Sequence, residues 1–195
     1  MELTFTIIVA YLIGNLSPSY VIGKLAKNID IREHGSGNAG ATNVLRVLGT
    51  KFAAITFVVD ALKGVLAVLV VRHLFGEDFA MVAGIAVVVG HNWPVILRFK
   101  GGKGVATSIG LILVIHPLYG FSAILLGVLA LLKTKIFSLG SLVGMISFAL
   151  IVLIFSRDYT IFAVLLATMG IYRHKENIKR LFRGEEKTIS KKKVS

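Results

Sequence analysis

The amino-acid sequence predicts an all-α membrane protein with seven transmembrane helices, its N-terminus outside and its C-terminus in the cytoplasm. Three observations lead to this prediction. Apolar residues make up 55% of the 195 residues, above the roughly 45–50% of soluble domains. They are gathered in blocks that approach the ~20 residues a helix needs to cross a bilayer. Lysine and arginine gather in alternate connecting segments. Disorder and cysteine-based sites are excluded, because the chain is strongly apolar and has no cysteine.

The first apolar block extends from Leu3 to about Gly23 and is expected to be kinked near Pro18. It lacks the basic start of a signal peptide, so we interpret it as a retained span. The other blocks are Phe52–Val71, Phe79–Leu97, Val105–Leu132, Ile136–Phe155 and Tyr159–Tyr172. The block 105–132 is too long for one ordinary crossing, and His116-Pro117 in its middle predicts a turn. Splitting it there gives seven spans.

The basic residues sort to one side of the membrane if there are seven spans. Nearly all of them lie in residues 24–51, 98–103 and 133–135 and in the tail from Arg173. Because loops rich in lysine and arginine stay in the cytoplasm, these segments are predicted to be cytoplasmic. A single crossing over 105–132 would move the next basic loop to the other side, which the charge distribution disfavours.

The chain is therefore expected to form one membrane domain over residues 1–172 and a basic cytoplasmic tail over 173–195. The tail ends in the basic run Lys191–Lys193. We interpret it as a topology anchor that touches anionic lipid. Nucleic-acid binding is disfavoured, because the basic residues mostly follow the cytoplasmic side of a membrane protein.

Three predicted cytoplasmic segments are unlike ordinary loops, and the first is rich in glycine. Gly35, Gly37 and Gly40 allow backbone N–H groups to converge on a phosphate without obstruction by side chains. The same spacing satisfies GxGxxG, but no strand precedes it, so we reject a dinucleotide site. The residues alone leave an anion site and a flexible loop both open. The polar residues of this segment are Ser36, Asn38, Thr42, Asn43 and Arg46.

The second segment contains Gly90-His91-Asn92-Trp93-Pro94 and, further on, Gly101-Gly102-Lys103-Gly104. The glycine-rich turn places a cation and free amides just before a predicted span, which suits phosphate. It is not a Walker A loop, because Lys103 is followed by Gly104 rather than Ser or Thr. His91 is either a hydrogen-bonded structural residue or a base, and the first is the more frequent.

The third segment runs from Arg173 to Arg180 and contains His174 and Asn177. An amphipathic helix continuing the last span explains it without any function, with Glu176 and Arg180 as an i,i+4 ion pair.

Two features lie inside the predicted spans. Asp60 and Lys63 are three residues apart, so an ion pair is expected, and it is either functional or purely structural. Gly140 and Gly144 form GxxxG, which predicts close helix packing.

Taken together, these segments resemble the integral-membrane glycerol-3-phosphate acyltransferases of the PlsY family. The resemblance covers nearly the whole chain, and the motifs occur in order on one predicted face. The family patterns are GSGNxGxTNxxR, GHxWP…FxGGKGVAT and RHxxNIxRL. They match at Gly35–Asn38, Gly40, Thr42, Asn43, Arg46, Gly90, His91, Trp93, Pro94, Phe99, Gly101–Thr107, Arg173, His174, Asn177, Ile178, Arg180 and Leu181.

The resemblance implies transfer of a fatty acyl group from acyl phosphate to the 1-hydroxyl of glycerol 3-phosphate, giving lysophosphatidate and phosphate. This is a step of phospholipid biosynthesis in the bacterial cytoplasmic (inner) membrane, with the active site facing the cytoplasm. No cofactor, metal, nucleic acid or obligate protein partner is expected; membrane lipids surround the chain. The expected acyl-phosphate site comprises Ser36, Gly37, Asn38, Gly40, Thr42 and Asn43.

The expected glycerol-3-phosphate site comprises Arg46, Lys63, Gly101, Gly102, Lys103, Gly104, His174 and Asn177. Catalytic roles are expected for Ser36, Arg46, His91, Lys103 and Asn177. Asp60 and Glu176 are expected to be structural. The proton acceptor is left open between His91 and a phosphate oxygen of the donor.

Four alternative interpretations are disfavoured. The HxxxxD signature of soluble-type acyltransferases occurs at His73 and Asp78, but that segment is predicted on the outer side, away from every motif. A transporter would suit the intramembrane ion pair and the broken first helix, but no inverted repeat is visible. A purely structural membrane protein is disfavoured by three phosphate-suited loops. Ser36 as an acyl nucleophile lacks a Ser-His-acid pattern, so direct transfer is expected.

Overall fold

The computed structural model describes residues 1–189, and the regular secondary structure of that range is entirely helical, without a strand. The described chain divides into two compact units, one over Met1–Pro117 and one beginning at Leu118. The expected boundary at residue 172 stays a prediction, and Lys191–Lys193 lie outside the described residues.

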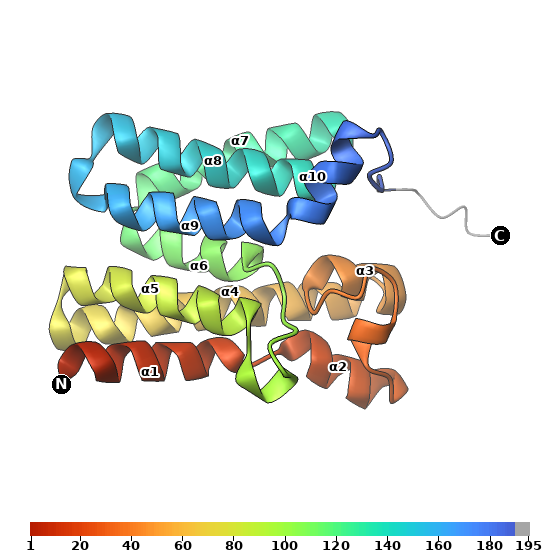
Figure 1. Ribbon diagram of the computed structural model, residues 1–195, viewed down its shortest axis with the longest axis horizontal. Helices are drawn as coiled ribbons and strands as arrows, with labels where there is room; N and C mark the ends of the chain where they lie inside the picture. Colours follow the sequence, from red (N-terminus) through yellow and green to blue (C-terminus); the bar gives the residue numbers. More distant parts are fainter. Residues whose placement is uncertain (190–195) are drawn as a thin grey trace. The chain divides into compact units, whose positions relative to one another are not determined.

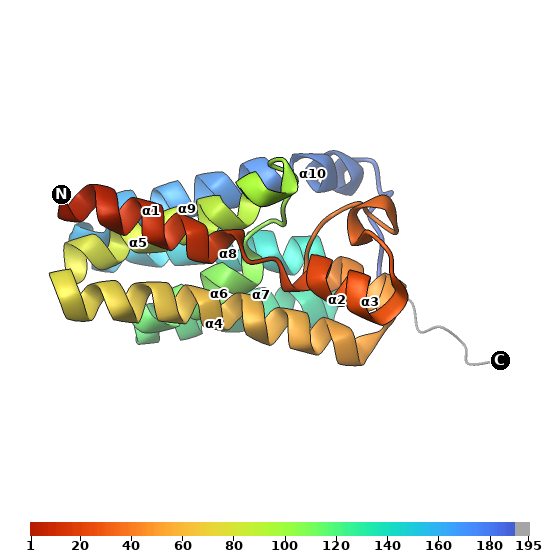
Figure 2. The same ribbon diagram turned by 90° about the horizontal axis from the view of Figure 1, so that it is seen from below.

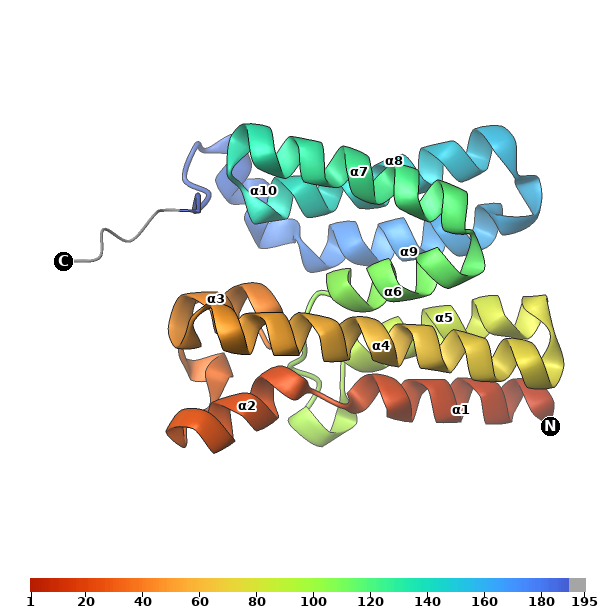
Figure 3. The same cartoon turned by 180° about the vertical axis from the view of Figure 1, so that it is seen from behind.

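The first unit contains six α-helices among the described residues, and the 3-10 turns η1 and η2 lie in its loops (Figure 1). Their bounds are α1 Glu2–Asn15, α2 Pro18–Lys27, η1 Ile31–Glu33, α3 Ala41–Leu48, α4 Thr50–Phe75, α5 Glu77–Asn92, η2 Val95–Leu97 and α6 Val105–Ile115. Helix α1 packs on α5, α5 on α4, and α4 on α6. The long helices lie side by side, and α2 and α3 lie together toward one end (Figures 1 and 3).

Glycines set the spacing between these helices. A Cβ on Gly14 of α1 would overlap the Val87 carbonyl, and one on Gly90 of α5 would overlap the Tyr11 carbonyl. Without a hydrophobic driving force between helices in lipid, such close backbone approach supplies the packing energy. Gly110 of α6 meets the backbone of Ala61 on α4 in the same way.

The second unit contains α7 Pro117–Thr134, α8 Phe137–Phe155, η3 Arg157–Tyr159, α9 Thr160–Arg173 and α10 Lys175–Phe182. Helix α8 packs on α9. The predicted GxxxG contact is confirmed, because a Cβ on Gly140 would lie 2.8 Å from the Gly127 carbonyl oxygen of α7 and one on Gly144 would lie 3.3 Å from that of Ala123.

Both predicted breaks in the apolar blocks are confirmed. The first block is interrupted between Asn15 and Pro18, and α1 and α2 are offset at this point (Figure 2). The long block divides where α6 ends at Ile115 and α7 begins at Pro117.

Five helical stretches of the described chain are long and apolar enough to cross a membrane, namely residues 2–27, 50–75, 77–97, 117–134 and 137–155. Helices α6 and α9 have 11 and 14 residues and are shorter than an ordinary span. The chain is thus all-helical with five spans by length, while the seven crossings and the orientation of the termini stay predictions.

We expect Gly110→Ala to lower the thermal stability of the purified protein in detergent. The added methyl group would overlap the Ala61 carbonyl, and such overpacking costs about 1–3 kcal/mol. The comparison is Gly144→Ala, where the nearest heavy atom to the new Cβ lies at 3.3 Å, so a smaller loss of stability is expected than at Gly110. Equal melting temperatures for the two variants would contradict the close α4–α6 packing.

Candidate active site

The first glycine-rich segment is a loop between η1 and α3 that is built around Asn43. The Asn43 Oδ1 accepts a hydrogen bond from the Ser36 backbone N–H at 2.7 Å. Its Nδ2 donates to the carbonyls of Ile31 and His34, each at 3.0 Å. The side chain is 1% exposed. Asn43, which we predicted as a donor-binding residue, therefore holds the loop in shape, an arrangement that favours a structural role.

The loop itself faces outward. Gly35 and Gly37 have φ values of 67° and 72°, a left-handed conformation that a side chain would strain. Ser36 and Arg46 are exposed, while Asn38, Gly40 and Thr42 are half-buried. Three of the loop's N–H groups, those of Ser36, Gly37 and Gly40, donate within the protein, and the exposed Arg46 guanidinium lies on the adjoining helix.

The second glycine-rich segment meets the first one at Gly102. The Gly102 N–H donates to the His91 carbonyl at 3.0 Å. A Cβ at this position would overlap the His91 ring nitrogen Nε2 and lie 2.8 Å from the Ala39 carbonyl oxygen. Gly102 thus lies between the first loop and the histidine. Lys103 is half-buried, and Gly104 with φ 78° precedes the first turn of α6, whose free N–H groups suit an anion.

A buried charged cluster lies beneath these loops, and it confirms the predicted Asp60–Lys63 ion pair. The Lys63 Nζ lies 2.6 Å from Asp60 Oδ1, 2.8 Å from His91 Nδ1 and 2.7 Å from the Leu16 carbonyl oxygen. Asp60 Oδ1 and His91 Nδ1 are 3.2 Å apart. The contacts with Leu16 and His91 are hydrogen bonds, and the contact with Asp60 is an ion pair. The contacts favour a structural role for Lys63 over the predicted contact with substrate phosphate.

His91 is placed between the ion pair and the glycine turn. Its Nδ1 faces Asp60 and Lys63, while its Nε2 faces Gly102, and the residue is 7% exposed. This environment favours the hydrogen-bonded structural interpretation of His91, since both ring nitrogens face protein atoms.

The second unit holds the third motif. His174 and Asn177 are 2% and 7% exposed. The His174 Nδ1 donates to the Gly170 carbonyl at 2.8 Å, which fixes the ring at the junction of α9 and α10.

Glu186, a residue that was not predicted from the sequence, accepts hydrogen bonds from residues of this motif. Its Oε1 accepts hydrogen bonds from Asn177 Nδ2 at 2.7 Å and Ser138 Oγ at 3.0 Å, and its Oε2 accepts one from Arg180 Nε at 2.7 Å. Burial raises the pKa of the Glu186 carboxyl, but these hydrogen bonds outweigh it and hold that pKa below its usual value. The carboxylate joins α8 to α10.

The predicted Glu176–Arg180 ion pair is wrong. Arg180 pairs with Glu186 instead, and Glu176 pairs with Lys179 at 3.2 Å on an exposed surface. Helical spacing alone suggested the first pairing, whereas the chain beyond α10 folds back and supplies a better-buried carboxylate. No spacing rule could have identified Glu186, because it lies past the end of the helix.

Residues 1–189, the part of the chain that the structure describes, contain no group of three or more His, Cys, Asp or Glu side chains that could hold a metal ion.

The fold and these loops define a class: a helical membrane protein with two glycine-rich loops that carry exposed or half-buried cations. Comparison with known proteins gives the family. The family model for glycerol-3-phosphate acyltransferase matches residues 4–184. Curated relatives include the glycerol-3-phosphate acyltransferases of Alkaliphilus metalliredigens, 54% identical over 95% of both chains, and of Clostridioides difficile, 46% identical over 95% of both.

Solved structures agree with the sequence relatives. The crystal structure of PlsY, an integral membrane glycerol 3-phosphate acyltransferase, superposes in its glycerol 3-phosphate form with a TM-score of 0.92. It is 37% identical and covers 97% of this chain and 96% of its own. The lysophosphatidic acid form of PlsY superposes with a TM-score of 0.89. The chain therefore belongs to the glycerol-3-phosphate acyltransferase family, as the motifs suggested.

We expect Glu186→Gln to lower the free energy of unfolding by about 2 kcal/mol at neutral pH, since hydrogen bonds to a charged group contribute about 1.5–3 kcal/mol. Because the carboxyl pKa is depressed in the folded protein, this contribution is present above the unfolded pKa and is lost as the pH falls through the folded one. Thermal unfolding measured against pH checks this. Glu185→Gln, at the exposed neighbouring residue, is the control. Equal stability of both variants would refute the role of Glu186.

Proposed function

We propose that this protein transfers a fatty acyl group from acyl phosphate to the 1-hydroxyl of glycerol 3-phosphate, releasing lysophosphatidate and inorganic phosphate. The reaction would serve phospholipid biosynthesis at the cytoplasmic face of the bacterial inner membrane. The observation that carries the proposal is the meeting of two glycine-lined loops at Gly102. Both substrates bear a phosphate, so the reaction needs two anion sites side by side. An amphiphilic donor reaches such a site from the bilayer, while the acceptor arrives from the cytoplasm.

The first loop is proposed to hold the donor phosphate. The backbone N–H groups of Asn38 and Ala39, with the Thr42 hydroxyl, would surround it. The N–H groups of Ser36, Gly37 and Gly40 donate within the loop, and Asn43 keeps the loop in shape. The exposed Arg46 on α3 would neutralise phosphate charge and the oxyanion that develops on the acyl carbonyl.

The acceptor phosphate is proposed to bind at the turn Gly101–Gly104 and the first turn of α6. Lys103 would supply the positive charge there. For His174 and Asn177, which lie in the second unit, a role in binding the acceptor stays a prediction from the family resemblance. Lys63 would act indirectly, by fixing His91 under the glycine turn.

The chemistry needs no covalent enzyme intermediate. The hydroxyl oxygen of the acceptor forms a bond to the acyl carbon, and the bond from that carbon to the phosphate oxygen breaks with its electron pair remaining on phosphate. We favour transfer of the hydroxyl proton to a phosphate oxygen of the acyl phosphate, because the His91 ring is surrounded by protein atoms. Phosphate is a good leaving group, so a strong general acid is not required.

The purified protein, incubated with acyl phosphate and glycerol 3-phosphate, should release inorganic phosphate only when the acceptor is present. Lysophosphatidate should form in equal amount. Absence of acceptor-dependent release would reject the enzyme proposal, and movement of glycerol 3-phosphate across vesicles without acyl transfer would favour a transporter. Trapping of an acyl-serine adduct at Ser36 would overturn direct transfer.

We expect Lys103→Ala to raise the KM for glycerol 3-phosphate at least tenfold, with a smaller effect on the KM for acyl phosphate, because the acceptor phosphate loses its cation. Steady-state kinetics with each substrate varied in turn measures this. Lys100→Ala removes an exposed charge from the same segment and should change neither constant more than about twofold. An unchanged KM for glycerol 3-phosphate in Lys103→Ala would contradict the acceptor assignment.

A separate substitution decides the proton acceptor. His91→Asn keeps a polar group near Asp60 and Lys63, and we expect a folded enzyme whose kcat falls less than tenfold with an unchanged pH profile. Positioned general bases contribute about 10²–10⁴-fold. A loss of that size, together with disappearance of a titration from the pH–rate profile, would assign the base to His91 and exclude the phosphate-assisted route.

A further inference from the structure

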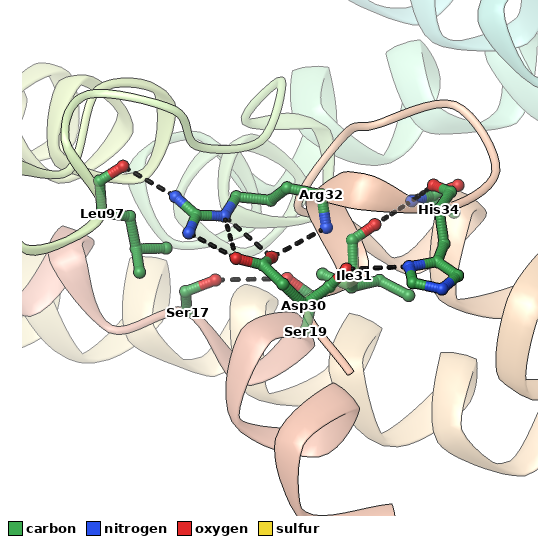
Figure 4. Close-up of polar contacts among 8 residues, drawn as sticks. Ser17, Ser19, Asp30, Ile31, Arg32, His34 and Leu97 are labelled. Carbon is green, nitrogen blue, oxygen red and sulfur yellow. Dashed lines mark hydrogen bonds and ion pairs between the residues drawn. The ribbon is translucent and has the colours of Figure 1, made fainter. Parts of the chain in front are cut away.

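Arg32, a residue outside the motifs considered above, lies between the two phosphate-suited loops. Its Nε and Nη2 donate to Asp30, at 2.9 Å to Oδ1 and 2.6 Å to Oδ2 (Figure 4). Its Nη1 donates to the Leu97 carbonyl oxygen at 2.8 Å. The guanidinium is thus fixed at three points, and one of them is the backbone of η2, which precedes the glycine turn.

The short segment that carries Arg32 is also the base of the first loop. Asn43, which shapes that loop, donates to the carbonyls of Ile31 and His34 on either side of Arg32. Displacement of the segment would therefore displace the Ser36 N–H that Asn43 holds.

On its other side, Arg32 reaches a segment whose backbone is strained. Arg98 and Phe99 directly follow Leu97 with φ values of 53° and 61°, a conformation uncommon for residues other than glycine. Such strain persists when surrounding contacts determine the path. The Lys100 N–H also donates to the Leu97 carbonyl, and the chain then enters the glycine turn. The carbonyl that Arg32 holds is therefore an anchor for the turn.

The Arg32–Asp30 ion pair is half-buried and held by further contacts, unlike a loose surface pair. The two side chains of the pair are 20% and 15% exposed. The Arg32 guanidinium also lies 5.2 Å from the ring centroid of Tyr20 on α2. The hydrogen bond from Arg32 lowers the pKa of Asp30, so the carboxylate stays charged well below neutral pH. A planar fork can hold a carboxylate with two donors and a carbonyl with a third, and an ammonium cannot reproduce this geometry.

We propose that Arg32 is a positioning residue that sets the distance between the donor-phosphate loop and the acceptor-phosphate turn. This inference rests on the proposed function, since it concerns the separation of the two bound substrates. Each loop keeps its own phosphate contacts when Arg32 is replaced, so binding of either substrate is little affected. Reaction between them is affected strongly, because a misplacement of about 1 Å can cost about 100-fold in rate.

The kinetic test is Arg32→Lys, which keeps the charge and loses the fork. The expected result is a fall in kcat of tenfold or more, with both KM values within threefold of the wild type. Arg98→Lys, the same exchange at an exposed residue of the neighbouring segment, should stay within twofold in kcat. If Arg32→Lys instead raises one KM at unchanged kcat, Arg32 is a binding residue and the positioning role is overturned.

A second measurement does not depend on activity. The chain has no cysteine, so cysteines introduced at exposed Glu33 and Lys100 take spin labels at those two places alone. The distance distribution between the labels should be narrow in the parent and broader or shifted with Arg32→Lys, and Asp30→Asn should reproduce the effect. An unchanged distribution in a folded variant overturns the inference. The wild type could show no acyl transfer while Arg32→Lys still broadens the distance distribution. That result would refute the proposed function and leave the role of the Arg32 contact standing.

Discussion

The buried ammonium of Lys63 is the constraint on which the first unit depends. A charge inside a membrane span is tolerated when it is fully partnered, and removing one partner of a buried charge typically costs several kcal/mol. Lys63 finds its partners on three separate elements: Asp60 on its own helix, His91 at the end of α5, and the Leu16 carbonyl at the junction of α1 and α2. Three helices must therefore meet at one point.

The broken first helix follows from this requirement. In an unbroken helix the Leu16 carbonyl would accept a hydrogen bond from the backbone four residues later, and only its second lone pair would be left for an ammonium. The break at Pro18 releases it. Close approach of α1 and α5 through Gly14 and Gly90 then brings the released carbonyl and His91 to the same ammonium. The ion pair, the helix break and the two glycines thus act together to place the partners of Lys63.

Residues that act locally could be predicted from the sequence, and residues that act at a distance could not. Proline interrupts the interior of a helix but is tolerated in its first turn, so the helix starts at Pro18 and Pro117 were predictable from the sequence. Three-residue spacing predicted the Asp60–Lys63 pair. The Leu16 carbonyl carries no side-chain signal. Glu186 lies beyond α10, and its partners include Ser138 on another helix. Helical spacing gave Arg180 the wrong partner, because the path of the chain after a helix is a tertiary property.

The polar residues of the loops and of the buried cluster divide by where their hydrogen bonds go. Asn43 bonds to backbone groups, Lys63 to the Leu16 carbonyl and to His91, and Asp30 to Arg32. Ser36 and Arg46, in contrast, are exposed. A site for phosphate needs rigid amides more than it needs many side chains, since an amide held in place loses no rotamer entropy on binding. Many of these side chains therefore serve to hold the loop backbone in place. Substitutions at them should act by displacing that backbone. Because glycine turns have no side chains to fix them, the internal hydrogen bonds of their neighbours must supply that rigidity.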